Sequence, residues 1–512
     1  MDQYDYIVVG GGTAGCVVAA RLSEVPGTRV LLLEAGSTQP LPAMSVPAAW
    51  PELMESAADW GYRTTPQAEA GPVAYPRGRA LGGSGAINAM AHFRGHAAVY
   101  DRWPPGWRYQ DLLPYFRRSE HTVGRDPALR GTDGPVRVAP VPEASRHPVA
   151  RAFAAALAAA GCPVTDDLSG ARQEGVGWPD LAINDGRRVG PADAYLRPAA
   201  GRPKLTVRGG CVATWLIIER GRCSGVRYLS QGLHAGARAA AEVIVCAGAI
   251  GTPKLLMLSG IGPARQLRGL GIDPVADLPD VGQNLVDHPV VMVTCQSAEP
   301  LPGSRYNHGE MYAELRSPLA GTWPDLQLFP ILLPLAAPGF PAPDAGFNLS
   351  ASVVAPDSRG SVALTSADPS APPVIDPGFL REGRDVDRLE TGVELIRSAA
   401  ADDALARLGT EVVPGPEVRA GPGLRQYIRR GVGSHYHPAG TCRLGADDSA
   451  VLDLDLRVRG VGGVRVVDAS VLPVIPNAPL NATVLAVAEK AASLITKSRH
   501  QVPLTSLINE SH

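Results

Sequence analysis

The sequence is poor in cysteine and has no excess of charge of either sign. Its seven cysteines contain no CxxC pair, which argues against a disulfide framework and a structural zinc site, so we expect reduced thiols and no metal. The formal net charge of -2 creates no overall field that favours nucleic acid or an acidic membrane. The cysteines are Cys16, Cys162, Cys211, Cys223, Cys246, Cys295 and Cys442.

Long apolar runs, targeting signals and internal repeats are also missing. No uninterrupted apolar run approaches the ~18–20 residues that span a bilayer. The opening residues, MDQYDYIVVGGG, lack the basic and apolar regions of a signal peptide. Together with the unpaired cysteines, these absences predict a cytoplasmic protein that binds neither nucleic acid nor a membrane. No pattern in the sequence predicts an oligomeric state.

The first clear pattern is a strand, a glycine-rich turn, a helix and a second strand. Tyr6–Val9 and Arg29–Glu34 are typical of buried parallel strands, and Cys16–Leu22 has a helical pattern. The turn between the first strand and the helix carries Gly10-x-Gly12-x-x-Gly15. This spacing within one βαβ unit predicts a dinucleotide-binding site.

Each residue of this pattern has its own task in such a site. Gly10 permits the tight turn, Gly12 lets the backbone approach a pyrophosphate at the helix N-terminus, and Gly15 lets helix and strand pack closely. Glu34 ends the second strand and can accept hydrogen bonds from ribose hydroxyls. The pattern alone does not separate FAD from NAD, but its place at the start of the sequence, followed by Ala35-Gly36, favours FAD.

The chain of 512 residues is long enough for two or three domains of roughly 100–200 residues. Residues 296–425 differ from the rest in carrying many prolines and strand-like pieces. The sequence therefore predicts a mixed α/β (α+β) fold, with a discontinuous Rossmann-like FAD-binding domain and a substrate-binding domain built on an antiparallel sheet. We expect the FAD-binding domain at residues 1–150, 191–295 and 426–500, the substrate-binding domain at 151–190 and 296–425, and a tail at 501–512.

Further motifs follow along the chain in a fixed order. They are Asp59-Trp60-x-Tyr62-x-Thr64, PRGRALGGSGAINAM at 76–90, GAIGTPKLLMLSGIG at 248–262, Gly282-x-Asn284-Leu285-x-Asp287-His288, His437-Pro438-x-Gly440-Thr441 and Val467-Asp468-Ala469-Ser470-x-x-Pro473. With these motifs and the βαβ unit, the chain resembles the glucose–methanol–choline (GMC) oxidoreductase family over nearly its whole length.

The resemblance implies that FAD binds in an extended conformation. Gly10, Gly12 and Gly15 would then hold the pyrophosphate, Glu34 the ribose, and Val212 would lie near the adenine. The other residues expected along the cofactor are Thr13, Ala14, Ala35, Trp60, Arg79, Gly82, Gly83, Asn88, Ala89, Met90, Ala247, Gly248, Asp468, Ala469, Asn481 and Thr483.

One departure from the family pattern concerns the attachment of the cofactor. Some members bind FAD covalently through a histidine just before the asparagine that matches Asn88. Ile87 occupies that position here and cannot form the bond. We therefore expect FAD to be non-covalent.

The resemblance assigns the catalytic base to His437, directly before the Pro-x-Gly-Thr turn. An imidazole suits this task because its pKa lies near working pH, so we expect the rate to rise with pH through one ionisation near the histidine range. His435 is a weaker candidate for a direct role. His288 is expected to order a loop near the flavin.

The usual second catalytic residue of the family, a His or Asn, is missing from its expected place. That position holds Pro479, which can neither move a proton nor donate a hydrogen bond, so we expect His437 to act without the usual partner. Relatives of the pyridoxine 4-oxidase type also carry proline there. Asn481, two residues further on, is a second candidate and Asn477 a third, although loop asparagines are usually turn formers.

By resemblance, the predicted reaction is the oxidation of an alcohol to an aldehyde by proton abstraction and hydride transfer to flavin N5. Oxygen or another electron acceptor would reoxidise the flavin. Pro479 favours an aromatic or heteroaromatic primary alcohol such as a pyridoxine-like substrate, while choline-like, sugar and aliphatic alcohols stay open. An alternative is a hydroxynitrile lyase that keeps FAD as a structural group.

Overall fold

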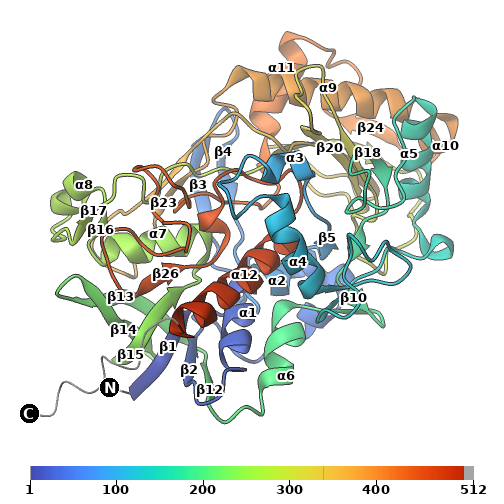
Figure 1. The fold of residues 1–512 in the computed structure, drawn as a ribbon. Helices are drawn as coiled ribbons and strands as arrows, with labels where there is room; N and C mark the ends of the chain where they lie inside the picture. The colour runs from blue at the N-terminus through green and yellow to red at the C-terminus, as the bar shows by residue number, and fades with distance from the viewer. Residues whose placement is uncertain (1, 338, 501–512) are drawn as a thin grey trace, which may run out of the picture.

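The computed structural model describes residues 2–337 and 339–500, so the tail expected at 501–512 lies outside the described residues. Figure 1 shows two lobes. The lower left lobe contains the sheet with β1 and β15 behind helices α1 and α12. The upper right lobe contains a second sheet with β18 and β20 beside helices α5, α9 and α11.

The first sheet forms around the predicted βαβ unit. β1 pairs in parallel with β2 and β15, β2 with β12, and β15 with β26, whereas β13, β14 and β15 form an antiparallel meander. Ile7, Val8 and Leu31 have no exposed surface, as the continuously apolar pattern predicts. In spatial order the strands are β12 Leu205–Arg208, β2 Val30–Leu33, β1 Asp2–Val9, β15 Leu233–Val245, β14 Arg222–Ser230 and β13 Cys211–Glu219, with β26 Val464–Val466 beside β15.

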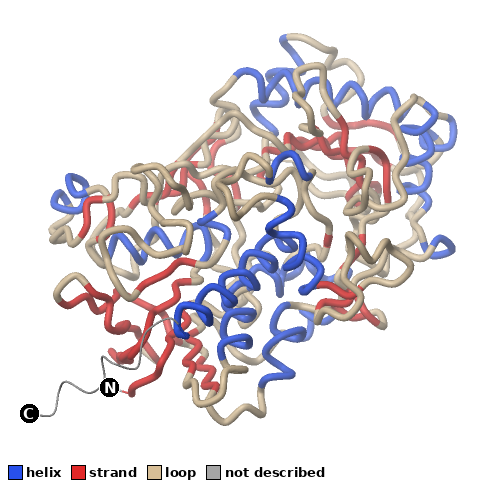
Figure 2. Tube along the Cα trace, in the orientation of Figure 1, coloured by secondary structure: helices blue, strands red, loops and turns tan. Residues whose placement is uncertain are grey.

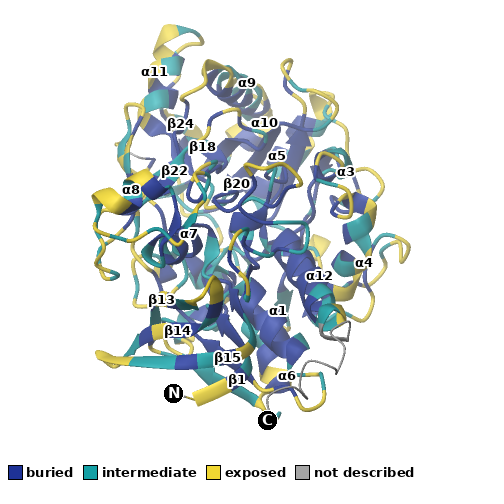
Figure 3. Cartoon of the chain, turned by 60° about the vertical axis from the view of Figure 1, so that its left-hand side comes forward, coloured by how far each residue is buried: buried dark blue, intermediate teal, exposed yellow. Residues whose placement is uncertain are grey.

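Helices from both ends of the chain pack on this sheet. α1 Thr13–Leu22 follows the glycine turn and lies against α12 Asn481–His500, so the C-terminal part of the chain returns to its N-terminal part. α7 Gly248–Leu258 packs against β13 and η5 Ala469–Val471. Figure 3 shows α1 largely buried, whereas α8 Ala264–Gly269 and α11 Pro422–Gly431 carry exposed surface. The predicted Rossmann-like domain is therefore present and is assembled from distant segments.

The second sheet is antiparallel throughout, as predicted. Its core-facing residues, such as Leu326, Leu328 and Ala351, pack against the apolar side of α9 Gly383–Ala400. The sequence predicts α9 because Val386, Leu389, Val393 and Ile396 recur at helical spacing, and all four are fully buried. In spatial order the strands are β24 Thr410–Val413, β18 Pro289–Gln296, β21 Gly346–Val353, β20 Leu326–Ile331, β19 Tyr312–Leu315 and β8 Gly175–Gly177, with β25 Gly433–Ser434 beside β18.

Residues 37–110, which have no long periodic pattern, form short elements and extended loops (Figure 2). Several of these loops line the cavity described below, which gives this irregular segment a function. Elements up to residue 121 are η1 Pro42–Ser45, η2 Pro47–Leu53, β3 Arg63–Gln67, β4 Gly71–Ala74, α2 Ser84–Ile87, β5 Ala91–His92, α3 Ala97–Tyr100, α4 Tyr109–Ser119 and β6 Glu120–His121.

The remaining elements are mostly short connections around the two sheets. They are β7 Val136–Arg137, η3 Glu143–Ser145, α5 Pro148–Ala159, β9 Asp180–Leu181, β10 Ile183–Asn184, β11 Arg187–Arg188, η4 Ala192–Leu196, α6 Arg197–Ala199, β16 Ile261–Gly262, β17 Ala276–Asp277, β22 Ser361–Ala363, β23 Val374–Asp376 and α10 Asp403–Ala406.

The expected domain boundaries stay a prediction, with one adjustment. β18 crosses the expected boundary between residues 295 and 296 and pairs within the antiparallel sheet. We therefore propose that the second segment of the substrate-binding domain begins at Pro289. All seven cysteines are free thiols, as expected. Among the described residues, no helix has the length and apolar character that crossing a membrane requires.

A buried acid lies on the cavity-facing side of the antiparallel sheet. Glu314 on β19 is directly opposite Gln327 on β20, and its Oε1 accepts a 2.5 Å hydrogen bond from the Gln327 side-chain amide. Burial raises the pKa of Glu314 from 4.5 to about 8. The folded protein thus holds a proton that the unfolded chain releases at much lower pH.

Raising the pH from about 5 to about 8 should therefore disfavour folding through Glu314, because over this interval the folded state binds one more proton than the unfolded state. Glu314→Gln keeps a group that can hydrogen-bond to Gln327 and removes this linkage. We expect its Tm to gain a few degrees relative to wild type at the higher pH and less at the lower pH, measured by calorimetry. An equal difference at both pH values would contradict the assignment.

Candidate active site

A cavity of about 1210 Å³ lies between the first sheet and the antiparallel sheet. It runs from the glycine turn at Gly10 to the histidine loop at His435–Pro438. Its volume exceeds the ~300–1,000 Å³ of common small-molecule sites. The cavity can therefore hold an extended dinucleotide together with a small second molecule.

The glycine turn approaches its neighbours too closely for side chains. Gly10 has a φ of +102°, and a Cβ there would lie 2.4 Å from the carbonyl oxygen of Cys246. A Cβ on Gly15 would lie 1.9 Å from the carbonyl oxygen of Gly10. Gly15 therefore serves helix–strand packing, as the sequence predicts, and places the N-terminus of α1 at the cavity.

The start of α1 offers a place for the pyrophosphate of FAD. Gly12 caps the helix without a side-chain hydrogen bond, and the first turn carries no acidic residue. Gly12, Thr13 and Ala14 line the cavity, so the amide end of the helix faces it. A Cβ on Gly12 would have the Cα of Gly83 as its nearest neighbour, at 3.8 Å, which leaves room for a phosphate group.

The carboxylate of Glu34 is held at the same end of the cavity. Its Oε2 accepts a hydrogen bond from the amide of Gly11 and its Oε1 from the amide of Gly36, each at 2.8 Å. Each oxygen keeps a lone pair that can accept from a ribose hydroxyl. Burial raises the pKa of Glu34 to about 7, against the opposing effect of the hydrogen bonds from Gly36 and Gly11.

The structure brings most of the predicted cofactor residues together around this cavity. Residues that line it are Gly10, Gly12, Thr13, Ala14, Glu34, Ala35, Trp60, Arg79, Gly83, Asn88, Ala89, Met90, Val212, Ala247, Gly248, Asp468, Ala469 and Asn481. Ile87, at the position of covalent attachment in some relatives, lines it as well. These residues fit an FAD molecule along the cavity.

Three predicted cofactor residues lie behind the cavity wall. Gly15 packs the helix, as described. The amide of Gly82 donates a 2.7 Å hydrogen bond to the carbonyl of Gly11 and so fixes the loop that carries Gly83. Thr483 is fully buried, and its hydroxyl bonds to that of Tyr100 at 2.7 Å. The structure thus gives Thr483 a packing role where the sequence suggested a cofactor contact.

Two hydrogen-bond clusters fix parts of the predicted cofactor wall. The carboxylate of Asp468 accepts from the amide of Gly248 at 2.8 Å and from the hydroxyl of Thr252 at 2.6 Å, joining the start of α7 to η5. The guanidinium of Arg188 donates to the backbone oxygen of Asn88 at 2.6 Å and to its side-chain oxygen at 2.8 Å. Sequence reasoning missed Arg188, because it lies on the two-residue strand β11, which carries no motif.

Asp287 fixes the loop that carries the predicted base. Its Oδ1 accepts from the amides of His288 and His437 at 2.7 and 2.8 Å, and its Oδ2 accepts from the hydroxyl of Ser434 at 2.5 Å. The backbones of Val286 and Ala439 also exchange hydrogen bonds. The two sequence motifs that contain Asp287 and His437 are therefore neighbours in space.

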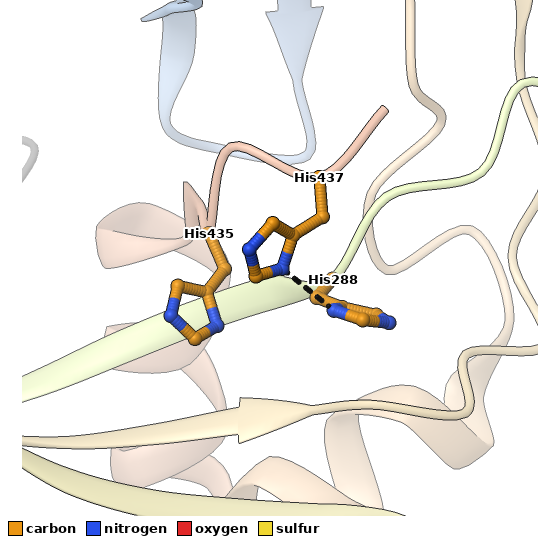
Figure 4. A group of neighbouring side chains, drawn as sticks. All are labelled: His288, His435 and His437. Carbon is orange, nitrogen blue, oxygen red and sulfur yellow. Dashed lines mark hydrogen bonds between the residues drawn. The ribbon is translucent and has the colours of Figure 1, made fainter. Parts of the chain in front are cut away.

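His437 is paired with His288 (Figure 4). Their Nδ1 atoms are 3.0 Å apart. Each neutral ring has one donor and one acceptor nitrogen, so the proton can lie on either Nδ1. Only when His437 donates does its Nε2 keep a lone pair that can accept a proton. His288, expected to order a loop, thus contacts the candidate base, and the direction of this hydrogen bond decides the tautomer of His437.

The surroundings of His437 favour the neutral ring. Burial lowers its pKa well below the ordinary value of 6.5, and His435, His288 and Arg77 lower it further. The expectation of an ionisation near the histidine range is therefore wrong for this environment. The imidazole of His437 is ready to accept a proton well below neutral pH.

His435 contributes a ring surface to the site. It stacks on Phe329 with ring centroids 4.6 Å apart, and its centroid is 4.5 Å from that of His437. Phe329 stacks on Tyr312 at 5.1 Å. We call Tyr312, Phe329 and His435 the aromatic ladder. All three line the cavity, and the ladder ends with His435 beside His437.

Two of the three predicted residues around the start of α12 line the cavity. Pro479 and Asn481 both line it. The side-chain oxygen of Asn481 accepts a 2.9 Å hydrogen bond from the hydroxyl of Thr13, which joins the starts of α12 and α1. Asn477 instead accepts from the amide of His96 at 2.7 Å and donates to the carbonyl of Pro324 at 3.1 Å. It holds the loop and does not line the cavity.

Comparisons with known proteins agree with the geometry. The GMC oxidoreductase family model matches residues 4–290 and 356–488. Oxygen-dependent choline dehydrogenase of Photobacterium profundum is 38% identical, with 96% of this chain and 93% of that protein covered. Human mitochondrial choline dehydrogenase is also 38% identical, with 96% and 90% covered.

A solved structure extends this agreement to the whole fold. Pyridoxine 4-oxidase from Mesorbium loti superposes with a TM-score of 0.92 at 36% identity and covers 98% of this chain and 100% of its own. The matches span both lobes and every motif that lines the cavity. The chain belongs to the GMC oxidoreductase family and is an FAD-dependent alcohol oxidoreductase.

Proposed function

We propose that this enzyme oxidises a primary alcohol carried on an aromatic or heteroaromatic ring to the aldehyde. The aromatic ladder beside His437 is the observation that carries the proposal, because its stacked rings form an apolar wall that a flat ring can contact edge to face. The alcohol would lie against the ladder with its hydroxyl toward His437. The name of the similar pyridoxine 4-oxidase supports a heteroaromatic substrate.

The charge of the cavity wall supports a neutral substrate. In the part of the chain that the structure describes, the antiparallel sheet and its loops contribute no Asp or Glu to the lining. Their contribution is mostly apolar and includes Val290, Met292, Ile331 and Phe340. A cationic alcohol would lose its hydration there without gaining a carboxylate partner.

In this proposal His437 is the base and His288 its positioning residue. With its proton on Nδ1 and donated to His288, the His437 ring accepts the alcohol proton at Nε2. The hydrogen bond to His288 then stabilises the imidazolium that forms. When bound, FAD would take the hydride that leaves the alcohol carbon. Pro479 shapes the wall beside this step and leaves His437 without the second proton-transfer residue common in the family.

A choline-like alcohol is the second candidate, favoured by the names of the choline dehydrogenase relatives. The hydroxynitrile lyase alternative is not favoured by these relatives.

We also propose a cytoplasmic location on the evidence of the free thiols, which fractionation of the native host cells would test.

Anaerobic mixing of the yellow enzyme with an alcohol panel tests the proposed function. We expect benzyl-type and pyridinemethanol-type alcohols to bleach the flavin and yield one aldehyde per FAD. Choline and a simple sugar alcohol should reduce the flavin far more slowly. If choline alone bleaches the flavin, the substrate is a choline-like alcohol and the aromatic proposal is wrong. If no alcohol bleaches the flavin, alcohol oxidation is contradicted. Aerobic and dye-coupled runs then identify the electron acceptor.

The form of the cofactor is tested by acid precipitation. We expect intact FAD in the supernatant, because Ile87 cannot attach it. Gly12→Leu should abolish FAD retention, since its side chain would occupy the space between α1 and Gly83. Gly201→Ala is the matched control, because a Cβ there meets no atom within 4 Å. Flavin that stays with the pellet would refute the non-covalent assignment.

His437→Ala should lower the rate of anaerobic flavin reduction by at least ~100-fold, the usual scale for loss of a general base. FAD should stay bound, because the glycine turn and Glu34 are unchanged. Pro479→Ala should lower the rate of flavin reduction far less than His437→Ala, and the rate of Asn481→Ala should lie between those of the two variants. His234→Ala, on the exposed end of β15, is the control. If His435→Ala abolishes reduction while His437→Ala does not, the base has been assigned to the wrong histidine.

A further inference from the structure

Tyr312 is a buried polar side chain at the end of the aromatic ladder opposite His437. It is 4% exposed and lines the cavity. Its ring is fixed on two sides, by stacking on Phe329 at 5.1 Å and by an edge contact with Phe93 at 5.2 Å. Its hydroxyl has no hydrogen-bond partner among the described residues and is open to the cavity. A rigid hydroxyl without a protein partner is thus placed at the cavity wall.

The space next to this hydroxyl is a small polar corner around Gly309. A Cβ built on Gly309 would lie 3.5 Å from the Tyr312 hydroxyl oxygen and 3.8 Å from the Asn307 side-chain nitrogen and the Pro330 carbonyl oxygen. The Asn307 nitrogen is already engaged, donating a 2.7 Å hydrogen bond to the carbonyl of Ala89. The Asn307 amide keeps its second N–H, and the Tyr312 hydroxyl is the side-chain group of this corner that has no protein partner among the described residues.

We propose that Tyr312 recognises a second polar group on the aromatic ring of the substrate, such as a phenolic hydroxyl or a ring nitrogen. This inference rests on the proposed function and narrows its substrate class to aromatic alcohols that carry such a group. The ring lies along Phe329 and His435, the reacting hydroxyl faces His437, and the second polar group enters the corner at Gly309. A tyrosine hydroxyl can donate to a ring nitrogen and can donate to or accept from a phenol.

The alternative explanation of Tyr312 is simple packing of the ladder. When no ligand is bound, this hydroxyl can be hydrated, and phenylalanine would pack the same ladder, so packing alone does not require a hydroxyl here. If Tyr312 only packs the ladder, Tyr312→Phe should change the dissociation constants of all ring ligands by the same factor. A recognition role predicts a loss confined to ligands that carry the second polar group.

Binding of the product aldehydes separates these roles without turnover. The dissociation constants of benzaldehyde, 3-hydroxybenzaldehyde and 4-hydroxybenzaldehyde can be measured in the FAD-loaded enzyme from the change in flavin absorbance. We expect wild type to bind at least one hydroxybenzaldehyde about 10-fold more tightly than benzaldehyde, the scale of one hydrogen bond. Tyr312→Phe should reduce that ratio to near one and leave benzaldehyde binding within about two-fold.

Gly309→Ala is an independent variant for the same corner. Its methyl group meets its neighbours at ordinary contact distances, so folding should be unaffected, but it occupies the space of the second polar group. It should weaken hydroxybenzaldehyde binding and spare benzaldehyde. Tyr115→Phe, at a tyrosine outside the cavity lining, should leave all three constants unchanged.

The inference is overturned if wild type shows no preference for either hydroxybenzaldehyde, or if Tyr312→Phe keeps the preference or weakens all three aldehydes equally. These outcomes are distinct from failure of the proposed function. If the preference depends on Tyr312 but no alcohol reduces the flavin, recognition by Tyr312 is supported and alcohol oxidation is contradicted. If aromatic alcohols reduce the flavin but the preference is absent, alcohol oxidation is supported and recognition by Tyr312 is contradicted.

Discussion

The candidate active site depends on one buried carboxylate, that of Asp287. It accepts hydrogen bonds from the amides of His288 and His437 and from the hydroxyl of Ser434. These bonds join two loops that are about 150 residues apart in sequence and hold their histidine rings within hydrogen-bond distance. Burial raises the pKa of Asp287, and the donors around it oppose this effect. Without this carboxylate, the amides of His288 and His437 and the hydroxyl of Ser434 would lose their common acceptor.

A neutral imidazole at this position can accept a proton without first losing one. Burial and the neighbouring rings lower the pKa of His437, and when its Nδ1 donates to His288 its Nε2 is left as the acceptor. The aromatic ladder then provides a surface on which a flat substrate can lie with its hydroxyl near that nitrogen. The same arrangement explains why the site can lack a second proton-transfer residue at Pro479.

The fold and the cofactor end of the site could be predicted from the sequence because their signals are local. The strand at Tyr6–Val9, the glycines of the turn and Glu34 lie within one short segment, and the helical spacing in α9 is visible without any tertiary contact. The substrate end could not be predicted in this way. Tyr312 and Phe329 lie on neighbouring strands with no distinctive spacing, and their stacking exists only once β19 and β20 pair. The pairing of His288 with His437 and the low pKa of His437 likewise arise from long-range packing.

The most direct test of this account is the pH dependence of anaerobic flavin reduction by a reactive aromatic alcohol. The account predicts that the rate in wild type rises with pH through one ionisation and reaches its plateau below the ordinary histidine pKa of 6.5, because His437 must be neutral and its pKa is lowered. In His437→Ala that ionisation should disappear together with most of the rate. An unchanged profile in His437→Ala, or a wild-type rate that rises only well above 6.5, would contradict a buried neutral His437 as the base.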